Sequence, residues 1–106
     1  MYSPDFSNKN NGDTDLILRF RTIKNKYPEA ILLLKVGNFY ESFDQDAIIT
    51  SQVLGTPLTK ANNGTMASHD FARFPSRAFD AHLRMLLKAG YRVAVSDQLK
   101  YPEAAV

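Results

Sequence analysis

With 106 residues, the chain is long enough to form one domain around a single modest hydrophobic core, and too short for two. Its 44% hydrophobic and 23% charged residues are ordinary for a globular protein. The sequence has no run of 18 apolar residues that would predict a membrane span, and its polar first residues do not predict a signal peptide. The absence of cysteine excludes disulfides, a thiol nucleophile and a cysteine-based zinc site. We therefore expect a soluble cytoplasmic domain with no membrane partner.

The first predicted helix follows a polar, asparagine-rich stretch over residues 1–12, which we expect to be a flexible lead-in to a domain over residues 13–106. Asp13 or Thr14 can cap this helix, because a side-chain oxygen there accepts a hydrogen bond from the first turn. Its apolar residues recur at helical spacing, at Leu16, Phe20, Ile23 and Tyr27.

Two strands are predicted next, over residues 31–36 and 39–43. The first is a run of aliphatic side chains, which is typical of a buried strand. Gly37 and Asn38 are predicted to form the turn between the strands, because both residue types tolerate positive φ.

A second helix is predicted over residues 45–54, after Asp44, which suits the N-cap position. A hairpin follows, with strands over residues 58–60 and 65–70 on either side of a turn that contains Gly64.

The third helix is predicted to begin near Pro75 and to end before Gly90, which suits the C′ position. A last strand is predicted over residues 91–97. Because strands and helices mix along the chain, we expect an α/β (α+β) fold, a single domain with a mixed β-sheet packed with about three α-helices.

Basic residues are concentrated in one part of the chain. Residues 60–92 carry six lysines and arginines against two aspartates. On the predicted third helix, Arg77, Arg84 and Lys88 are expected to lie opposite the apolar residues. This pattern is typical of a polyanion-binding surface, but ordinary solvated helix faces show it too. Charge alone leaves both interpretations open.

The strand over residues 39–43 carries an unusual pair. Phe39 and Glu41 are two residues apart and share one face of the strand. If Glu41 were a residue at the core edge, its carboxylate would need a partner, because an unpaired charge is costly to bury. An aromatic ring beside a hydrogen-bond acceptor suits a flat object with polar edges, such as a nucleobase. We therefore expect Phe39 to be substantially exposed in the free domain.

Enzymatic chemistry has little support in the sequence. His69 and His82 are far apart in the chain, and Asp44 and Asp46 are explained by the start of a helix. No phosphate-binding loop or known catalytic motif occurs. We expect no enzyme activity, no metal site and no cofactor.

Three segments occur in one order along the chain: KYPEAILLLKVGNFYESFDQDA, LGTPLTKANNG and FPSRAFDAHLRMLLKAGYRVAVSDQL. Together they resemble the N-terminal mismatch-recognition domain (domain I) of the MutS family of DNA mismatch-repair proteins, over about residues 20–102. The resemblance implies that Phe39 wedges into the minor groove and stacks on a mispaired base, and that Glu41 hydrogen-bonds that base. It also implies two partners, namely double-stranded DNA with mispaired or unpaired bases, and mismatch-repair proteins.

The candidates for phosphate contact under this resemblance are Lys60, Arg73, Arg77 and Arg84. The chain departs from the family pattern at several places. Arg73 stands where the family usually has glycine, and Asn38 stands where it usually has aspartate. Ala61 follows Lys60 where relatives often have a second basic residue, and Ser76-Arg77 replaces a histidine pair. We expect a rearranged rather than a lost phosphate-contacting surface.

Proteins of this family continue into connector, lever, clamp and ATPase domains, and full-length relatives use ATP through the ATPase domain. These 106 residues do not include that domain and hold no Walker A motif. The resemblance therefore predicts a stand-alone, monomeric module that binds mismatched DNA and is nucleoid-associated when bound. An alternative is a protein-interaction module that keeps the fold and binds through the Phe39 surface. A small enzyme is the third and least supported interpretation.

Overall fold

The computed structural model describes the backbone of residues 7–61 and 69–96, and the side chains of residues 16–60 and 69–96. The element order is α1 (Ser7–Lys24), β1 (Ala30–Val36), β2 (Phe39–Phe43), α2 (Asp44–Leu54), β3 (Thr59–Ala61), β4 (His69–Pro75), the 3-10 helix η1 (Ser76–Ala78), α3 (Phe79–Lys88) and β5 (Arg92–Ser96). The described strands form one sheet in the order β3-β4-β2-β1-β5, in which β1 and β5 run parallel and the other neighbours run antiparallel. The expected single-domain α/β (α+β) fold with a mixed sheet and three α-helices is confirmed.

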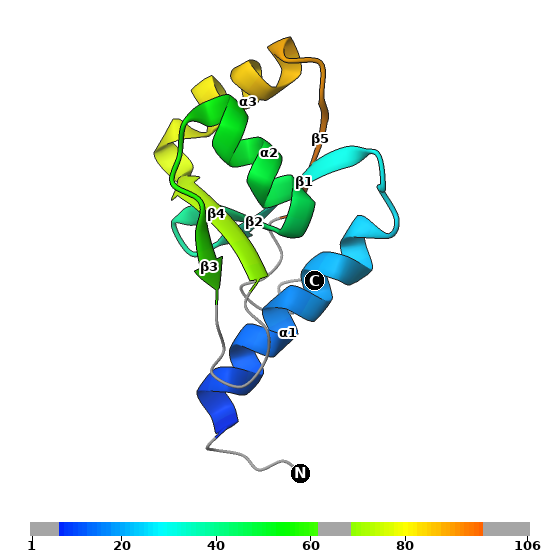
Figure 1. The fold of residues 1–106 in the computed structure, drawn as a ribbon, viewed down its shortest axis with the longest axis vertical. Helices are drawn as coiled ribbons and strands as arrows, with labels where there is room; N and C mark the ends of the chain where they lie inside the picture. Colours follow the sequence, from blue (N-terminus) through cyan, green and yellow to red (C-terminus); the bar gives the residue numbers. More distant parts are fainter. Residues whose placement is uncertain (1–6, 62–68, 97–106) are drawn as a thin grey trace.

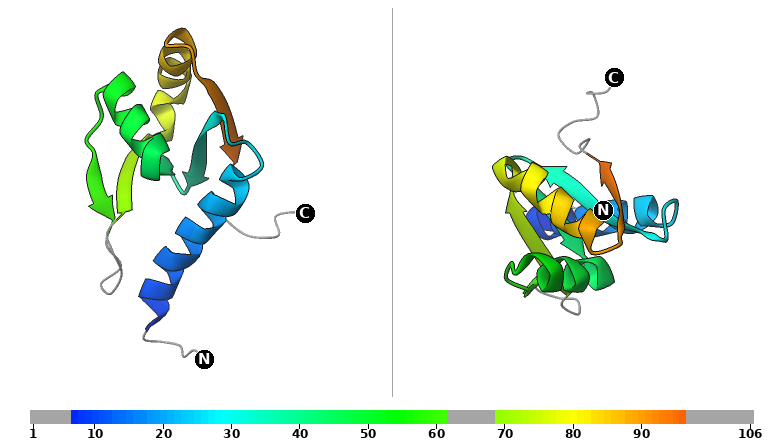
Figure 2. Two further views of the ribbon diagram at one scale, coloured as in Figure 1. Left: turned by 45° about the vertical axis from the view of Figure 1, so that its right-hand side comes forward. Right: turned by 90° about the horizontal axis from the view of Figure 1, so that it is seen from above.

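The sheet is covered on both faces, by α1 on one side and by α2 and α3 on the other (Figure 1 and Figure 2). Strand β1 explains this arrangement, because successive side chains of a strand point to opposite faces. Leu32 and Leu34 pack with Phe20 of α1, whereas Ile31 and Leu33 pack with Leu86 of α3. The aliphatic run of β1 therefore supplies both halves of the core.

The turn between β1 and β2 is as short as predicted, since Val36 pairs directly with Phe39. Gly37 has φ +62°, in the left-handed region that favours glycine, whereas Asn38 does not have a positive φ. The backbone carbonyl of Asn38 instead accepts a hydrogen bond of 2.8 Å from the N–H of Ser76. The β1–β2 turn is thereby joined to the start of η1.

The start of α1 differs from the expectation. The helix begins at Ser7 rather than at Asp13 or Thr14, so residues 7–12, which we expected to belong to the lead-in, are helical. The apolar spacing used for the prediction has no signal there, because residues 7–12 contain no apolar side chain. Once a helix has formed, each residue added to it gains one backbone hydrogen bond, so the helix can extend over residues 7–12 without apolar side chains.

The hairpin formed by β3 and β4 is present, with Thr59 opposite Phe71 and Ala61 opposite His69. Its second strand lies further along the chain than the predicted 65–70, at His69–Pro75, because its residues from Phe71 to Pro75 pair with β2. The predicted turn residue Gly64 lies outside the described residues. Gly90, with φ +97°, follows the last turn of α3 as predicted.

The predicted N-cap role of Asp44 is wrong. The N-cap residue of α2 is Phe43, which makes no side-chain capping hydrogen bond, and Asp44 is the first helical residue, with φ +59°. The chain passes from β2 into α2 without a loop, and the reversal of direction falls on Asp44, a residue type that tolerates the left-handed region. Its carboxylate accepts two hydrogen bonds from Arg21 of α1, at 2.9 and 3.1 Å. This hydrogen bonding raises the pKa of Arg21 above its usual value.

Asp46 joins three elements. Its buried carboxylate accepts a hydrogen bond of 3.0 Å from the N–H of Leu32 in β1 and forms an ion pair with Lys24 of α1 at 3.0 Å. Leu32 lies beyond the β1–β2 ladder, which ends at the pair Leu34–Glu41, so on that side its N–H faces no strand partner. Asp46 supplies the missing acceptor.

No helix within the described part of the chain is long and apolar enough to cross a membrane.

Candidate nucleic-acid interface

Phe39 and Glu41 lie on the face of the sheet that packs against α1, together with Phe43 of the same strand. The strand pairing fixes their neighbours. Glu41 lies between Leu34 of β1 and Arg73 of β4, and Phe39 lies between Val36 and Pro75. The two side chains therefore stand side by side near the β1–β2 turn, as the sequence predicts.

Arg73 is the residue that completes this cluster. Its guanidinium carbon lies 4.1 Å from the centre of the Phe39 ring, which is within cation–π distance. Its Nη1 atom lies 3.8 Å from Oε2 of Glu41. The Arg73 side chain is 50% exposed and that of Glu41 is 9% exposed. One guanidinium group thus contacts both residues of the predicted base-binding pair.

The exposure of Phe39 differs from the expectation. Phe39 is half-buried rather than substantially exposed, and the guanidinium of Arg73 lies on its ring. Phe39 is not part of the deep core either, since the buried clusters on this face consist of residues such as Phe20, Leu32 and Leu34. The buried carboxylate of Glu41 needs a compensating charge, and Arg73 supplies one.

The remaining basic candidates are spread over the molecule. Arg77 lies in η1, two residues after Pro75, which pairs with Phe39, and is exposed. Arg84 is exposed on α3, which packs against the opposite face of the sheet. Lys60 forms an ion pair of 2.8 Å with Asp70, five residues before Pro75 and therefore about 17 Å along β4. The structure brings Arg73 to the Phe39–Glu41 pair, places Arg77 close by in the chain, and does not bring Lys60 or Arg84 there.

Sequence reasoning missed the contact between Arg73 and the pair. The signal is the alternation of β4, in which Phe71, Arg73 and Pro75 share one face. This signal is readable only when the strand is placed at His69–Pro75, and that placement depends on pairing with a strand some thirty residues earlier.

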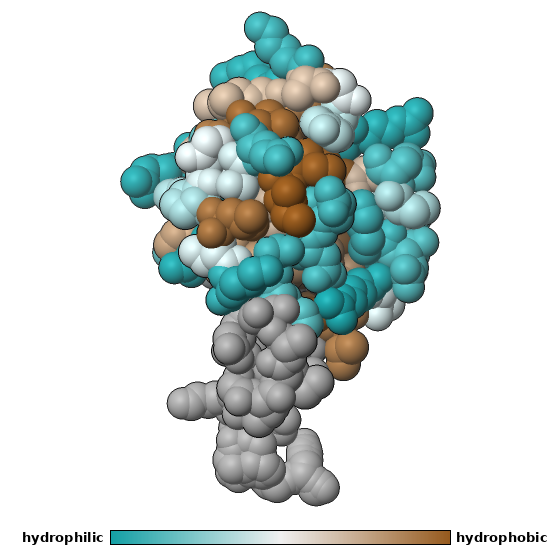
Figure 3. Space-filling view, in the orientation of Figure 1, coloured by the Kyte–Doolittle hydropathy of each residue, from teal (hydrophilic) through white to brown (hydrophobic). Residues whose placement is uncertain are grey.

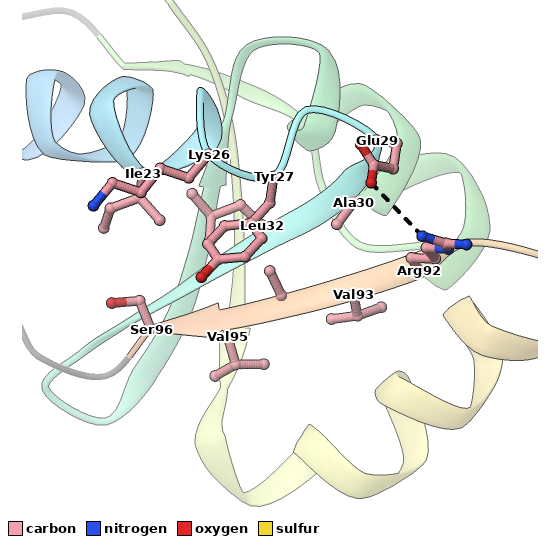
Figure 4. Close-up of a pocket in the computed structure, with 11 residues that line it drawn as sticks. Ile23, Lys26, Tyr27, Glu29, Ala30, Leu32, Arg92, Val93, Val95 and Ser96 are labelled. Carbon is pink, nitrogen blue, oxygen red and sulfur yellow. Dashed lines mark ion pairs between the residues drawn. The ribbon is translucent and has the colours of Figure 1, made fainter.

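The groove in Figure 4 lies at the other end of the sheet, between the end of α1 and the edge strand β5. It has a volume of about 540 Å³ and is lined by apolar residues such as Ile23, Tyr27 and Val93. An ion pair of 3.6 Å between Glu29 and Arg92 crosses its rim. These two charged side chains are exposed and paired with each other.

His82 lies on α3, which packs against the face of the sheet opposite Phe39 and Glu41. His82 packs its ring edge-on against Phe74, with ring centres 4.6 Å apart, which agrees with the structural role predicted for it. Within residues 7–61 and 69–96, no group of three or more histidine, aspartate or glutamate residues is placed to hold a metal ion.

Figure 3 shows hydrophobic residues gathered over the middle of one face, near α2, with hydrophilic residues around them.

Comparison with known proteins gives matches over most of the chain. The family model described as MutS domain I matches residues 14–106. The chain is 46% identical over 91 residues to the DNA mismatch repair protein MutS of Porphyromonas gingivalis, which is 86% of this chain and 10% of that protein. It is 48% identical over 86 residues to MutS of Cytophaga hutchinsonii, covering 81% of this chain and 10% of that protein. MutS of Flavobacterium johnsoniae is 45% identical over 91 residues, with coverages of 86% and 10%. The chain thus spans about a tenth of the length of these curated relatives.

Proposed function

Since the chain belongs to the MutS family, with residues 14–106 matching MutS domain I, we propose that it is a DNA-binding module of the mismatch-repair type. Its ligand under this proposal is double-stranded DNA with a mispaired or unpaired base, and it acts by binding, without catalysis and without a cofactor of its own. It works in the cytoplasm, at the nucleoid, where the DNA is.

Phe39 is the proposed wedge and Glu41 the proposed acceptor. The observation that carries this assignment is their placement side by side on one face of β2, at the end of the sheet next to the β1–β2 turn. An aromatic ring that enters the minor groove partly unstacks a base step and kinks the duplex, at a cost of about a few kcal/mol. A mismatched step is already weakened and costs less to open, so selectivity arises from DNA deformability as well as from contact with the base.

Arg73, Arg77, Lys60 and Arg84 are the proposed phosphate contacts. Arg77 has the strongest support, because it is exposed and follows Pro75, the neighbour of Phe39 in the sheet. Lys60 and Arg84 lie away from Phe39 and would contact the duplex only at some distance from the wedge. Phosphate contacts position the protein on DNA and carry no base preference.

A titration of the 106-residue chain tests the proposal. Fluorescence anisotropy is measured with a duplex that contains a G·T mismatch, one with an unpaired base, and the matched control, at several salt concentrations. We expect weak binding, in the range of about 10⁻⁴–10⁻⁶ M at physiological salt, because the basic excess of residues 60–92 is small. We also expect a modest preference for the two defective duplexes. Binding that does not weaken with salt would point to the protein-interaction alternative.

A further inference from the structure

The position that the proposed function assigns to a nucleobase is filled by the protein itself. The guanidinium of Arg73 lies 4.1 Å from the centre of the Phe39 ring and 3.8 Å from the Glu41 carboxylate. A guanidinium group is flat, carries hydrogen-bond donors along its edge, and stacks on aromatic rings. It therefore lies against both groups that would hold a mispaired base, with a cation–π contact to Phe39 and an ion pair to Glu41.

The backbone of Arg73 is held in the sheet, because residue 73 pairs with Glu41 of β2. The side chain can move, because it is half-exposed and a flexible aliphatic stem carries its guanidinium group. The carboxylate of Glu41, with a side chain only 9% exposed, loses a cationic neighbour when Arg73 leaves. Displacement is therefore easiest when the incoming group itself donates a hydrogen bond to Glu41.

We propose that Arg73 is a specificity-determining residue, which closes the Phe39–Glu41 surface in the free domain and is displaced by a mispaired base. A matched duplex, whose bases stay stacked, offers no group to replace the guanidinium, so Arg73 stays on Phe39. This inference rests on the proposed function, since it names what competes with the base at the same site.

The test compares Arg73→Met with Arg77→Met, which removes the same charge outside the cluster. The methionine side chain keeps much of the arginine stem and removes the guanidinium. Anisotropy with G·T, unpaired-base and matched duplexes gives the ratio of mismatched to matched affinity. We expect R73M to raise this ratio about two- to fivefold, the change that corresponds to the loss of an exposed cation–π contact. R77M should lower the affinity for all three duplexes and leave the ratio unchanged.

Further variants separate a failure of this inference from a failure of the proposed function. In the double variant Phe39→Ala, Arg73→Met the gain should disappear, because no ring is left to uncover. If R73M lowers the ratio or changes it no more than R77M does, while Phe39→Ala abolishes the preference, the proposed function stands and the role of Arg73 is overturned. If neither the wild-type chain nor R73M prefers a mismatch, both are overturned.

Folding of the variant is checked by thermal unfolding, and Arg73→Lys covers the case in which R73M does not fold. Lysine keeps a positive charge near Glu41 but lacks the flat guanidinium. We expect R73K to raise the ratio by less than R73M, in the same direction. A ratio for R73K equal to or below that of the wild-type chain would overturn the proposal.

Discussion

Glu41 combines a structural contact with the base-binding role that we propose for it. Its carboxylate is nearly buried, and Arg73 supplies a compensating charge at 3.8 Å. The same carboxylate is a poor partner for DNA in general, because phosphates repel it. We therefore attribute to Glu41 selectivity for a mispaired base rather than affinity for the duplex.

Glu41→Gln tests this attribution at the residue scale. The amide removes the negative charge and keeps an acceptor oxygen. We expect a higher affinity for the matched duplex, because a repulsion is removed, and a smaller ratio of mismatched to matched affinity. Anisotropy titrations at low salt measure both. An E41Q variant with an unchanged ratio would mean that Glu41 does not contact the base.

Among the helices and strands, the elements with a local signal were predicted well. The aliphatic run of β1, the strand β2 and the end of α3 before Gly90 lie where the sequence places them, whereas α3 begins at Phe79, after η1, rather than near Pro75. The position of β4 and the role of Asp44 were not predicted. Both depend on contacts with residues distant in the sequence, β4 on its pairing with β2 and Asp44 on its hydrogen bonds with Arg21.

The candidate site follows the same division. The pair of Phe39 and Glu41 is predictable, because residues two apart in a strand share a face. The position of Arg73 over that pair is not, because it requires the register between β2 and β4. The separation of Lys60 and Arg84 from Phe39 likewise requires the order of the strands and the faces on which the helices lie.

Asp46→Asn tests the junction of α1, β1 and α2 at the scale of elements. The change removes the ion pair with Lys24 and weakens the hydrogen bond from Leu32 in a site that is 4% exposed. We expect the free energy of unfolding to fall by about 1–3 kcal/mol, the range for lost hydrogen bonds to charged groups. Urea denaturation followed by circular dichroism measures it.

The matched control for this variant is Asp44→Asn. The ion pair of Asp44 with Arg21 is more exposed, with side chains 38% and 47% exposed, so water screens it. We expect a loss of at most about 1 kcal/mol, as for other exposed pairs. Equal losses in the two variants would contradict the structural role assigned to Asp46.

For the whole molecule, we predict that the 106-residue chain is monomeric. Its exposed large hydrophobic residues come from several elements: they include Leu18 of α1, Leu58 before β3, Met85 and Leu87 of α3, and Val95 of β5. Scattered apolar residues are normal on a monomer surface and do not predict a self-complementary interface. Sedimentation velocity at micromolar concentration measures the state. A tight dimer there would contradict the prediction and would favour the protein-interaction alternative.

The wedge role of Phe39 is the central claim, and the affinity ratio of Phe39→Ala tests it most directly. The variant is titrated with G·T and matched duplexes beside Arg77→Ala, an exposed basic residue outside the Phe39–Glu41–Arg73 cluster. We predict that F39A removes the preference for the mismatch and keeps most of the salt-dependent binding, whereas R77A weakens binding to both duplexes alike. A mismatch preference that survives in F39A would contradict the account.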